Sequence, residues 1–290
     1  MVVRHLLIPI ANRNSYTWIV TQRFSTASSA VLFLCIASAC LAQAPDVETI
    51  VQRSVAANNA DWKANPEFDW TERDLQSDGG TKTFHELMIL GSPYGRLVEI
   101  NGKPVSADIS RRQQQKLDAE IAKRRHESPQ QRHKRISEFQ KDRSRDRVMM
   151  EQLTKAFNFK LTGDEKIDSY DTYVLKATPK RGYQPPNMQA QALKGMQGTL
   201  WIDKTSFQWV KVTAEVVNPV SIEGFIAQVQ PGTNFELEKA PVAEGVWLPK
   251  HYSMRAKAKV LYLFPHKGHD EETYWDYHRS QDYSVRGKGE

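Results

Sequence analysis

Cysteine is almost absent from this chain of 290 residues, and both copies, Cys35 and Cys40, lie close to the N-terminus. A protein that begins after them has no disulfide bonds, no thiolate nucleophile and no cysteine ligands for a metal. Catalytic motifs are also missing: the sequence has no G-x-S-x-G element, no phosphate-binding G-x-x-x-x-G-K-[ST] loop and no G-x-G-x-x-G turn. These absences favour a non-catalytic protein, and an enzyme of an unrecognised type is the alternative.

Apolar runs long enough to cross a membrane are missing as well. The longest is AVLFLCIASACLA at 30–42, which follows three arginines in a stretch without acidic residues. A basic stretch, an apolar core and small residues at its end are typical of a secretory signal peptide. We therefore expect residues 1–42 to be removed after Ala42, leaving an exported protein of the periplasm or cell envelope. An uncleaved anchor is disfavoured because the run is shorter than the roughly 20 residues of a spanning helix, and lipidation at Cys40 is a further alternative.

The remaining chain, residues 43–290, has the composition of a globular protein. It contains 37 basic and 34 acidic residues, a net charge of only +3. Its length suits one large domain, which can form a sufficient core without disulfide bonds. We expect a single domain over 43–290 with an insert at about 108–147.

Hydrophobic periodicity predicts few helices and many strands. Residues 46–60 have apolar positions at helical spacing, with Asp46 as the N-cap and Asn58-Asn59 as a stop. Strands with turn signals follow from 67 to 105, and Asn101-Gly102 between extended runs predicts a hairpin. A second amphipathic helix is expected at 148–157, and nearly all of the chain after 158 alternates as β-strands do. The fold class is therefore mainly β with a few helices, of the α+β type.

The insert is strongly basic. Residues 108–147 hold 13 basic and 7 acidic residues, and SPQQ at 128–131 divides them. Both a polar helical hairpin and a partly disordered segment fit this pattern. Nucleic acid is an unexpected partner, because stacking aromatics are missing apart from Phe139. A solvated helical face is the simplest interpretation, and contact of 111–147 with an anionic membrane or a protein is the alternative.

Two stretches show the clearest alternation. HYSMRAKAKVLYLF at 251–264 predicts an antiparallel strand with one buried and one hydrated face. GTLWIDKTSFQWVKVTAEV at 198–216 predicts a hairpin whose two arms carry aliphatic residues on one side. In this pattern Trp201 and Trp209 fall on the opposite, convex side, where they could pair across the strands.

The segment HKGHDEETYWDYH at 266–278 contains the best metal-ligand candidates. They are nitrogen and oxygen donors in one short stretch: His266, His269, Asp270, Glu272 and His278. Their spacing matches no zinc motif, so a polar surface turn between two strands is preferred and no metal is expected.

Residues 158–216 resemble the outer-membrane lipoprotein carrier and lipoprotein-sorting superfamily. The resemblance rests on a strand that ends in Leu-x-x-x-Pro-Lys and on a Trp-Ile-Asp-Lys hairpin. The matching residues are Tyr173, Leu175, Pro179, Lys180, Trp201, Ile202, Asp203 and Lys204. It implies an unclosed antiparallel β half-barrel with helices over its concave face. It also implies binding of lipid or lipoprotein acyl chains without catalysis or cofactor.

Shared alternation together with this resemblance predicts the lining of a cavity. The expected lining residues are aliphatic or aromatic positions of the two alternating stretches: Leu200, Ile202, Val210, Val212, Met254, Val260 and Tyr262. The first functional hypothesis is thus an exported protein that binds acyl chains in a hydrophobic groove. The alternative is an envelope sensor or scaffold that binds a protein through the half-barrel and the basic insert.

Overall fold

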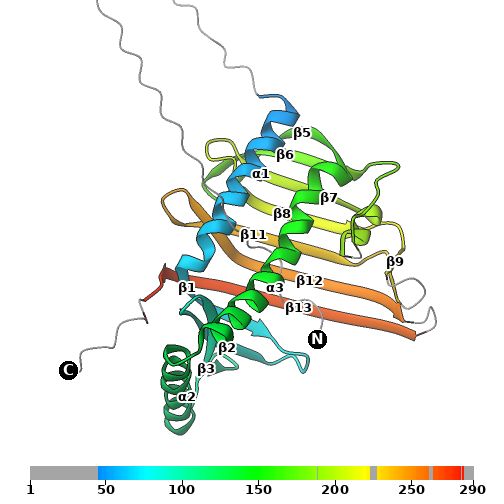
Figure 1. The fold of residues 1–290 in the computed structure, drawn as a ribbon. Coiled ribbons are helices and arrows are strands. Elements are labelled where there is room, and N and C mark those ends of the chain that lie inside the picture. Colours follow the sequence, from blue (N-terminus) through cyan, green and yellow to red (C-terminus); the bar gives the residue numbers. More distant parts are fainter. Residues whose placement is uncertain (1–44, 188, 223–226, 261–263, 282, 284–290) are drawn as a thin grey trace, which may run out of the picture.

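The computed structural model describes residues 45–187, 189–222, 227–260, 264–281 and 283. The expected leader at 1–42 and Tyr262 lie outside these residues. Thirteen strands form one antiparallel, unclosed sheet in the order β4-β3-β2-β1-β13-β12-β11-β8-β7-β6-β5, with β9 and β10 joined to β12 through β10. The fold is the expected α+β half-barrel, with α1 and α3 crossing the same face of the sheet (Figure 1).

The strands fall into two groups along the chain. The N-terminal strands are β1 (Phe68–Leu75), β2 (Thr81–Ile89), β3 (Ser92–Ile100) and β4 (Lys103–Pro104). The later strands are β5 (Phe157–Ile167), β6 (Tyr170–Pro179), β7 (Met196–Asp203), β8 (Trp209–Val216), β9 (Val220–Ile222), β10 (Ala227–Val229), β11 (Asn234–Ala243), β12 (Val246–Val260) and β13 (Phe264–Arg279). The long strand β13 joins the two groups, because it pairs with both β1 and β12.

The α-helices are α1 (Val47–Ala64), α2 (Ala107–Arg125) and α3 (Pro129–Ala156), and two short 3-10 helices are η1 (Asn65–Glu67) and η2 (Gln189–Gly195). Asp46 caps α1 as expected, with its side chain accepting a hydrogen bond from the Thr49 amide at 3.0 Å. Ser128 and Gln131 form a capping box at the start of α3. None of the helices in the described ranges is long and apolar enough to span a membrane.

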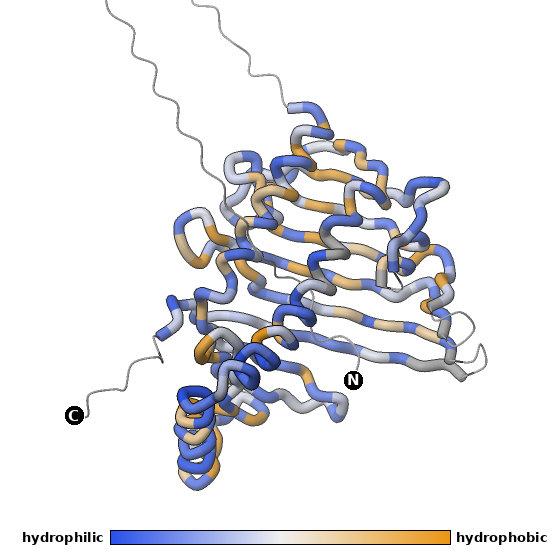
Figure 2. Tube along the Cα trace, viewed as in Figure 1, coloured by the Kyte–Doolittle hydropathy of each residue, from blue (hydrophilic) through white to orange (hydrophobic). Residues whose placement is uncertain are grey.

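The basic segment 108–147 contains α2, which is mainly hydrophilic (Figure 2), and most of α3. The helix expected at 148–157 is the C-terminal part of α3, which begins at Pro129. Helix α1 also runs past the expected stop. Asn58 lies inside the helix, where its side-chain amide donates to the Ser54 carbonyl at 3.0 Å and its oxygen accepts from Lys239 at 2.8 Å. A tertiary contact therefore overrides a local stop signal.

Turn chemistry fixes the strand pairing of the N-terminal group. Leu90-Gly91 and Asn101-Gly102 both have positive φ at each residue, as a two-residue type I′ hairpin requires. The Asn-Gly hairpin expected from the sequence is thereby confirmed. The stretch at 251–264 is corrected, because β12 ends at Val260 and Phe264 already begins β13. The segment 266–278 is likewise a strand and not a surface turn.

Candidate functional site

The face crossed by α1 and α3 changes character across the sheet. One register row runs through six strands and joins side chains that share this helix-covered face: Leu175, Leu200, Val212, Leu237, Tyr252 and Glu272. The first four are buried, Tyr252 is half-buried, and Glu272 is a carboxylate. The row therefore passes from a dry core through a partly covered aromatic residue to a polar edge.

The first part of this row is the sealed core, which we define as the buried apolar cluster beneath α1. Ile50 and Val51 of α1 pack there against strands β5–β8 and β11. Leu175 and Ile202 are completely buried. A full side chain of this kind stabilises the fold by about 1.5–3 kcal/mol when it is removed from water.

A buried ion pair fixes α1 on the sheet. Lys239 Nζ lies 2.5 Å from Asp61 Oδ2, and the two side chains are only 4 % and 3 % exposed. Asp61 Oδ1 also accepts from Gln208 and from the Trp247 amide, both at 2.9 Å. Burial lowers the pKa of Lys239 and raises the pKa of Asp61, and the opposite charge of each partner counteracts both shifts. The network satisfies both charges, so α1 is held by polar as well as apolar contacts.

Beyond the sealed core lies the half-buried strip, which we define as Phe235, Tyr252 and Met254. Phe235 pairs with Met254 in the register, and the rings of Phe235 and Tyr252 are 6.4 Å apart. All three side chains are on the helix-covered face, yet each remains partly exposed. The strip therefore combines apolar surface with incomplete cover, which is the property a lipid-binding surface requires.

The seven residues expected to line a cavity occupy different environments. Leu200, Ile202 and Val212 belong to the sealed core, and Val210 is buried outside that cluster. Met254 lies in the half-buried strip. Val260 ends β12, and Tyr262 lies outside the described residues. The sequence placed Tyr252 on the same strand face as Met254 without including it in the cavity lining. Phe235 was missed, although alternation in 234–238 was a usable signal.

The two tryptophans of the 198–216 hairpin do not share a side. Trp201 lies opposite Lys211 and donates from Nε1 to Glu165 Oε2 at 2.7 Å, on the face away from α1. Trp209 instead pairs with Ile202, is buried, and donates to Ser54 Oγ of α1 at 2.6 Å. A β-bulge shifts the register between these pairs and reverses the side on which Trp209 lies. The expected convex position is therefore correct for Trp201 and wrong for Trp209.

Carboxylates border the half-buried strip on its other side. Glu72, Asp74 and Glu272 each contribute one carboxylate oxygen to a cluster in which these oxygens lie within 4.8 Å of one another. The Tyr274 hydroxyl donates a hydrogen bond to Glu272. Burial raises the pKa of Glu72 well above its ordinary value, and hydrogen bonding to Asp74 and nearby carboxylates add to this. Burial beside other carboxylates therefore favours the protonated form of Glu72. Of the donors at 266–278, only Glu272 enters it. His269 alternates to the opposite side of β13, and Asp270 faces the same side as Glu272 but pairs with Met254, farther along the strand.

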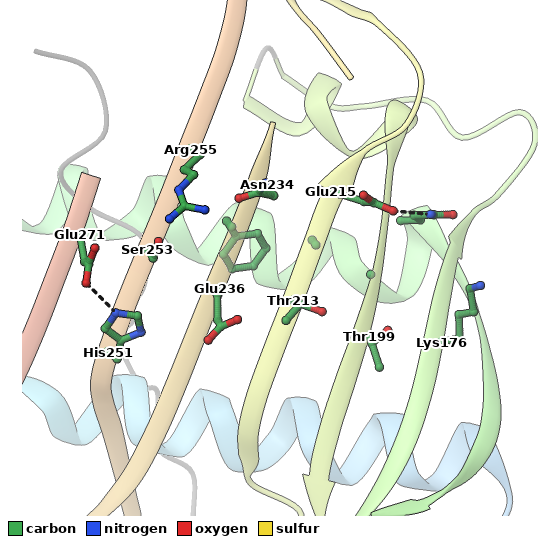
Figure 3. Close-up of a pocket in the computed structure, with 14 residues that line it drawn as sticks. Lys176, Thr199, Thr213, Glu215, Asn234, Glu236, His251, Ser253, Arg255 and Glu271 are labelled. Atoms are coloured by element: carbon green, nitrogen blue, oxygen red, sulfur yellow. Dashed lines mark hydrogen bonds and ion pairs between the residues drawn. The ribbon is translucent and has the colours of Figure 1, made fainter. Parts of the chain in front are cut away.

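The opposite face, which we call the open face, carries a broad polar groove of about 560 Å³ (Figure 3). Its floor crosses strands β6 to β13 and presents Thr199, Thr213 and Ser253. Glu271 lies between two histidines, 3.6 Å from His251 Nε2 and 3.4 Å from His269 Nε2. None of the seven expected cavity residues lines it. This groove suits hydrated polar groups and offers an acyl chain little apolar surface.

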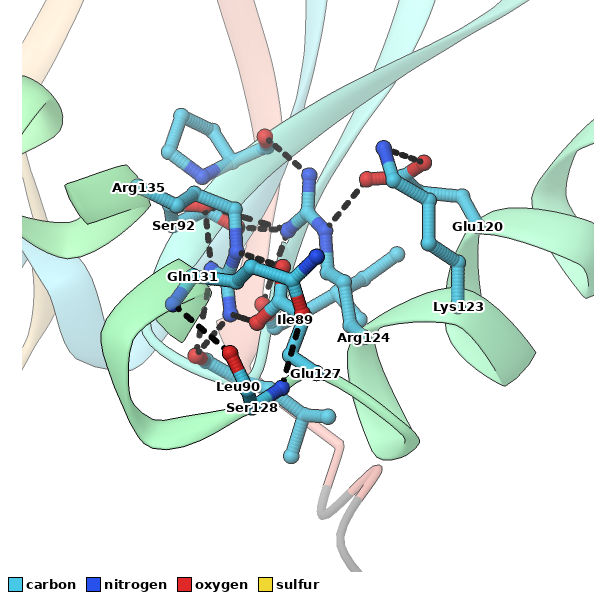
Figure 4. Close-up of polar contacts among 11 residues, drawn as sticks. Ile89, Leu90, Ser92, Glu120, Lys123, Arg124, Glu127, Ser128, Gln131 and Arg135 are labelled. Atoms are coloured by element: carbon cyan, nitrogen blue, oxygen red, sulfur yellow. Dashed lines mark hydrogen bonds and ion pairs between the residues drawn. The ribbon is translucent and has the colours of Figure 1, made fainter. Parts of the chain in front are cut away.

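Two arginines of the basic segment have a structural role at the β2–β3 turn (Figure 4). Arg124 of α2 is buried, and its Nη1 donates to the carbonyls of Ile89 and Ser92 at 2.8 and 2.7 Å. Arg135 of α3 donates to the Leu90 carbonyl at 3.3 Å and to Ser92 Oγ at 2.8 Å. The turn is thus held by both helices. These two charges are not part of a solvated face, contrary to the simplest interpretation of the sequence.

Comparisons with known proteins give a likeness of fold. No protein-family model matches the chain, and no curated protein matches it. Among solved structures, a LolA superfamily protein of Nitrosomonas europaea is 13 % identical with a TM-score of 0.31, and the match covers 82 % of this chain and 95 % of that one. An outer membrane lipoprotein-sorting domain of Vibrio parahaemolyticus is 11 % identical with a TM-score of 0.31, covering 81 % and 92 %.

A third match is Pseudomonas aeruginosa MucB, whose structure is a complex with MucA. It is 10 % identical with a TM-score of 0.22, and the match covers 82 % of this chain and all of that chain. A likeness at these values concerns the general fold alone and says nothing about a ligand of this protein.

Proposed function

We propose that the protein is exported and binds the acyl chain of a lipid or lipoprotein on the helix-covered face, beside the half-buried strip. The observation that supports this is the incomplete cover of Phe235, Tyr252 and Met254 on a face whose neighbouring strands are sealed. Transfer of an acyl chain from water to apolar surroundings is worth about 0.8 kcal/mol for each CH₂. A dozen such groups along the strip would hold a lipid tail firmly.

The placement of the expected cavity residues narrows this site. Leu200, Ile202 and Val212 already pack against α1, so an acyl chain that reached them would have to displace that helix. The Asp61–Lys239 pair opposes such a displacement. Met254, Phe235 and Tyr252 offer apolar surface that an acyl chain can contact without displacing α1. We therefore place the acyl chain on the strip and keep the three core residues as its wall.

A charged substitution in the strip tests the proposal. Met254→Glu should abolish retention of lipid by protein purified from its own cell envelope, because a carboxylate would lie against the acyl chain. Lys259→Glu is the matched control, since Lys259 lies on the same strand, is exposed and alternates to the open face. Native mass spectrometry should detect a bound mass in the wild type and the control that organic solvent removes.

Two results would count against acyl-chain binding. One is a folded Met254→Glu variant, checked by circular dichroism, that retains the same bound mass as the wild type. The other is wild-type protein from the envelope that carries no lipid at all.

The basic helices support a second candidate, a sensor or scaffold that contacts a protein partner or an anionic membrane. Arg111, Arg112, Lys116 and Lys134 are exposed on α2 and α3. Deleting the segment would not test this, because Arg124 and Arg135 hold the β2–β3 turn. Replacing Arg111, Arg112 and Lys116 by Glu is cleaner. If the protein is a sensor or scaffold, this triple variant should lose co-purification of its partner. If it binds acyl chains, the variant should keep the lipid content of the wild type.

A further inference from the structure

A second, more enclosed pocket lies at the other end of the sheet, on the open face. Its volume is about 410 Å³, within the range of about 300–1,000 Å³ that is usual for small-molecule sites. Strands β1, β2, β3 and β13 form its floor, and α2 together with Gln281 and Tyr283 forms its walls. Apolar lining residues include Trp70 of β1, Leu87 of β2, and Leu117 and Ile121 of α2.

The strand register places this pocket on the face opposite the acyl site. Glu271 and Trp275 alternate on the open side of β13, Trp275 pairs with Thr71, and Thr71 pairs with His85. Helix α2 therefore covers the side that α1 and α3 leave open. Arg125 Nε donates to the Tyr283 carbonyl at 2.9 Å and so holds Tyr283 beside α2. The basic segment thus builds one wall of a separate cavity.

Arg96 is the notable polar group of the pocket. Its Nη1 donates to Gln114 Oε1 at 2.8 Å, and its Nη2 lies 3.3 Å from His85 Nδ1. Its Nε is buried without a hydrogen-bond acceptor. Asp276 also lines the pocket, but among the described residues no carboxylate oxygen lies within ion-pair distance of this guanidinium. Within the described part of the chain, this half-buried, permanently charged group therefore contacts only neutral acceptors.

His85 adds a second donor. Arginine has no acceptor atom, so His85 Nδ1 accepts the hydrogen bond from Arg96 and the ring proton of the neutral imidazole is on Nε2. Burial lowers the pKa of His85, and the charge of Arg96 adds to this effect. The buried carboxylate of Asp69 does not pair with Arg96 in the described part of the chain. Its Oδ1 accepts from the Met88 amide at 2.7 Å, whereas its Oδ2 lies 3.8 Å from His278 Nε2 and has no hydrogen-bond partner among the described residues.

We propose that this pocket binds a small molecule that carries a carboxylate or phosphate group on an apolar body. The anionic group would pair with Arg96, whose charge lacks a counterion in the described part of the chain, and the body would contact Leu87, Leu117 and Ile121. A planar guanidinium suits either anion, because both accept two parallel hydrogen bonds. The site is independent of acyl-chain binding, since it lies on the other face of the sheet.

Probe molecules of matched shape test the proposal. Benzoate and phenyl phosphate carry the two anionic groups, and benzamide is the neutral counterpart of benzoate. We expect benzoate or phenyl phosphate to bind the full chain with a dissociation constant in the millimolar range or below. Benzamide should bind at least about tenfold more weakly. Ligand-detected NMR titration measures the affinities, and the better of the two anions identifies the head group.

Gln114→Glu is the decisive variant, because it places a carboxylate where a neutral oxygen now accepts from Arg96. Gln114 is exposed on α2, so the core is undisturbed. The internal counterion should weaken binding of the anionic probe about tenfold. Arg96→Gln should do the same, and Arg73→Gln is the matched control, since Arg73 lies on β1, pairs with Glu99 and does not line the pocket.

Equal affinities for benzoate and benzamide would overturn the proposal. So would a folded Gln114→Glu protein that binds the anionic probe as the wild type does, or wild-type protein that binds neither anion at millimolar concentration.

Discussion

The sealed core and the half-buried strip lie on the same face of the same sheet and carry the same alternating pattern, yet they differ in cover. Leu237 in the sealed core is buried beneath α1, whereas Tyr252, its direct partner on the next strand, is partly exposed. Alternation determines which side of a strand is apolar. What lies over that side is decided by the helices, and α1 is fixed over only part of the sheet. The difference separates residues that stabilise the fold from residues available to a ligand.

The largest expected effect comes from breaking the ion pair that holds α1. Lys239→Ala would leave Asp61 buried without its cation, which should lower the free energy of unfolding by about 3–5 kcal/mol. Lys250→Ala is the control, because Lys250 forms a partly exposed pair with Glu238 at 3.2 Å and should cost about 1 kcal/mol or less. Urea unfolding measures both. Similar losses in the two variants would mean that the pair does not seal the core.

Alanine substitutions on each side of the boundary sharpen the comparison directly. Leu237→Ala should cost about 2–5 kcal/mol, because it leaves a cavity in the sealed core. Met254→Ala should cost about 1 kcal/mol, since its side chain is only partly removed from water in the free protein. The measurement is chemical unfolding of lipid-free protein. If Met254→Ala were as costly as Leu237→Ala, the strip would be core and not a binding surface.

Arg124→Ala tests how the basic segment is anchored. Loss of its hydrogen bonds to the β2–β3 turn leaves buried carbonyls without donors and should cost about 2 kcal/mol. Lys123→Ala changes the neighbouring, exposed cation and should alter stability by about 0.5 kcal/mol or less. Thermal unfolding of both variants measures these two stability losses. An unaffected Arg124→Ala protein would show that the segment is held by other contacts.

The smallest effect concerns pH. The hydrogen bond from Arg135 holds the pKa of Glu127 below its ordinary value. A carboxyl whose pKa is lower in the folded state stabilises the fold above its unfolded-state pKa, about 4.3, and loses this contribution as pH falls through the folded-state value. Glu127→Gln should therefore be less stable than the wild type at pH 7 by about 1 kcal/mol or less, and equal to it at acidic pH. A difference that does not depend on pH would contradict this role.

Much of the fold follows from local signals, whereas the site depends on contacts between distant segments. Asp46 as an N-cap, Asn101-Gly102 as a hairpin and the alternating strands were all predictable, because each signal is read within a few residues. The side taken by Trp209 was not, since one extra residue in a bulge reverses it. Arg124 looked like part of a solvated basic run, and only the folded chain brings the β2–β3 carbonyls to it. Alternation likewise could not show which apolar residues of the sheet are covered by the helices.

Photo-crosslinking tests the central claim most directly. A palmitate analogue with a diazirine along its acyl chain is bound to the full protein and irradiated, and the modified peptides are mapped by mass spectrometry. Acyl-chain binding on the half-buried strip predicts adducts on Tyr252 and Met254, which do not line the open-face groove, and excess palmitate should prevent them. Adducts confined to the open-face groove around Thr213 and Ser253, or no competable adducts at all, would contradict it.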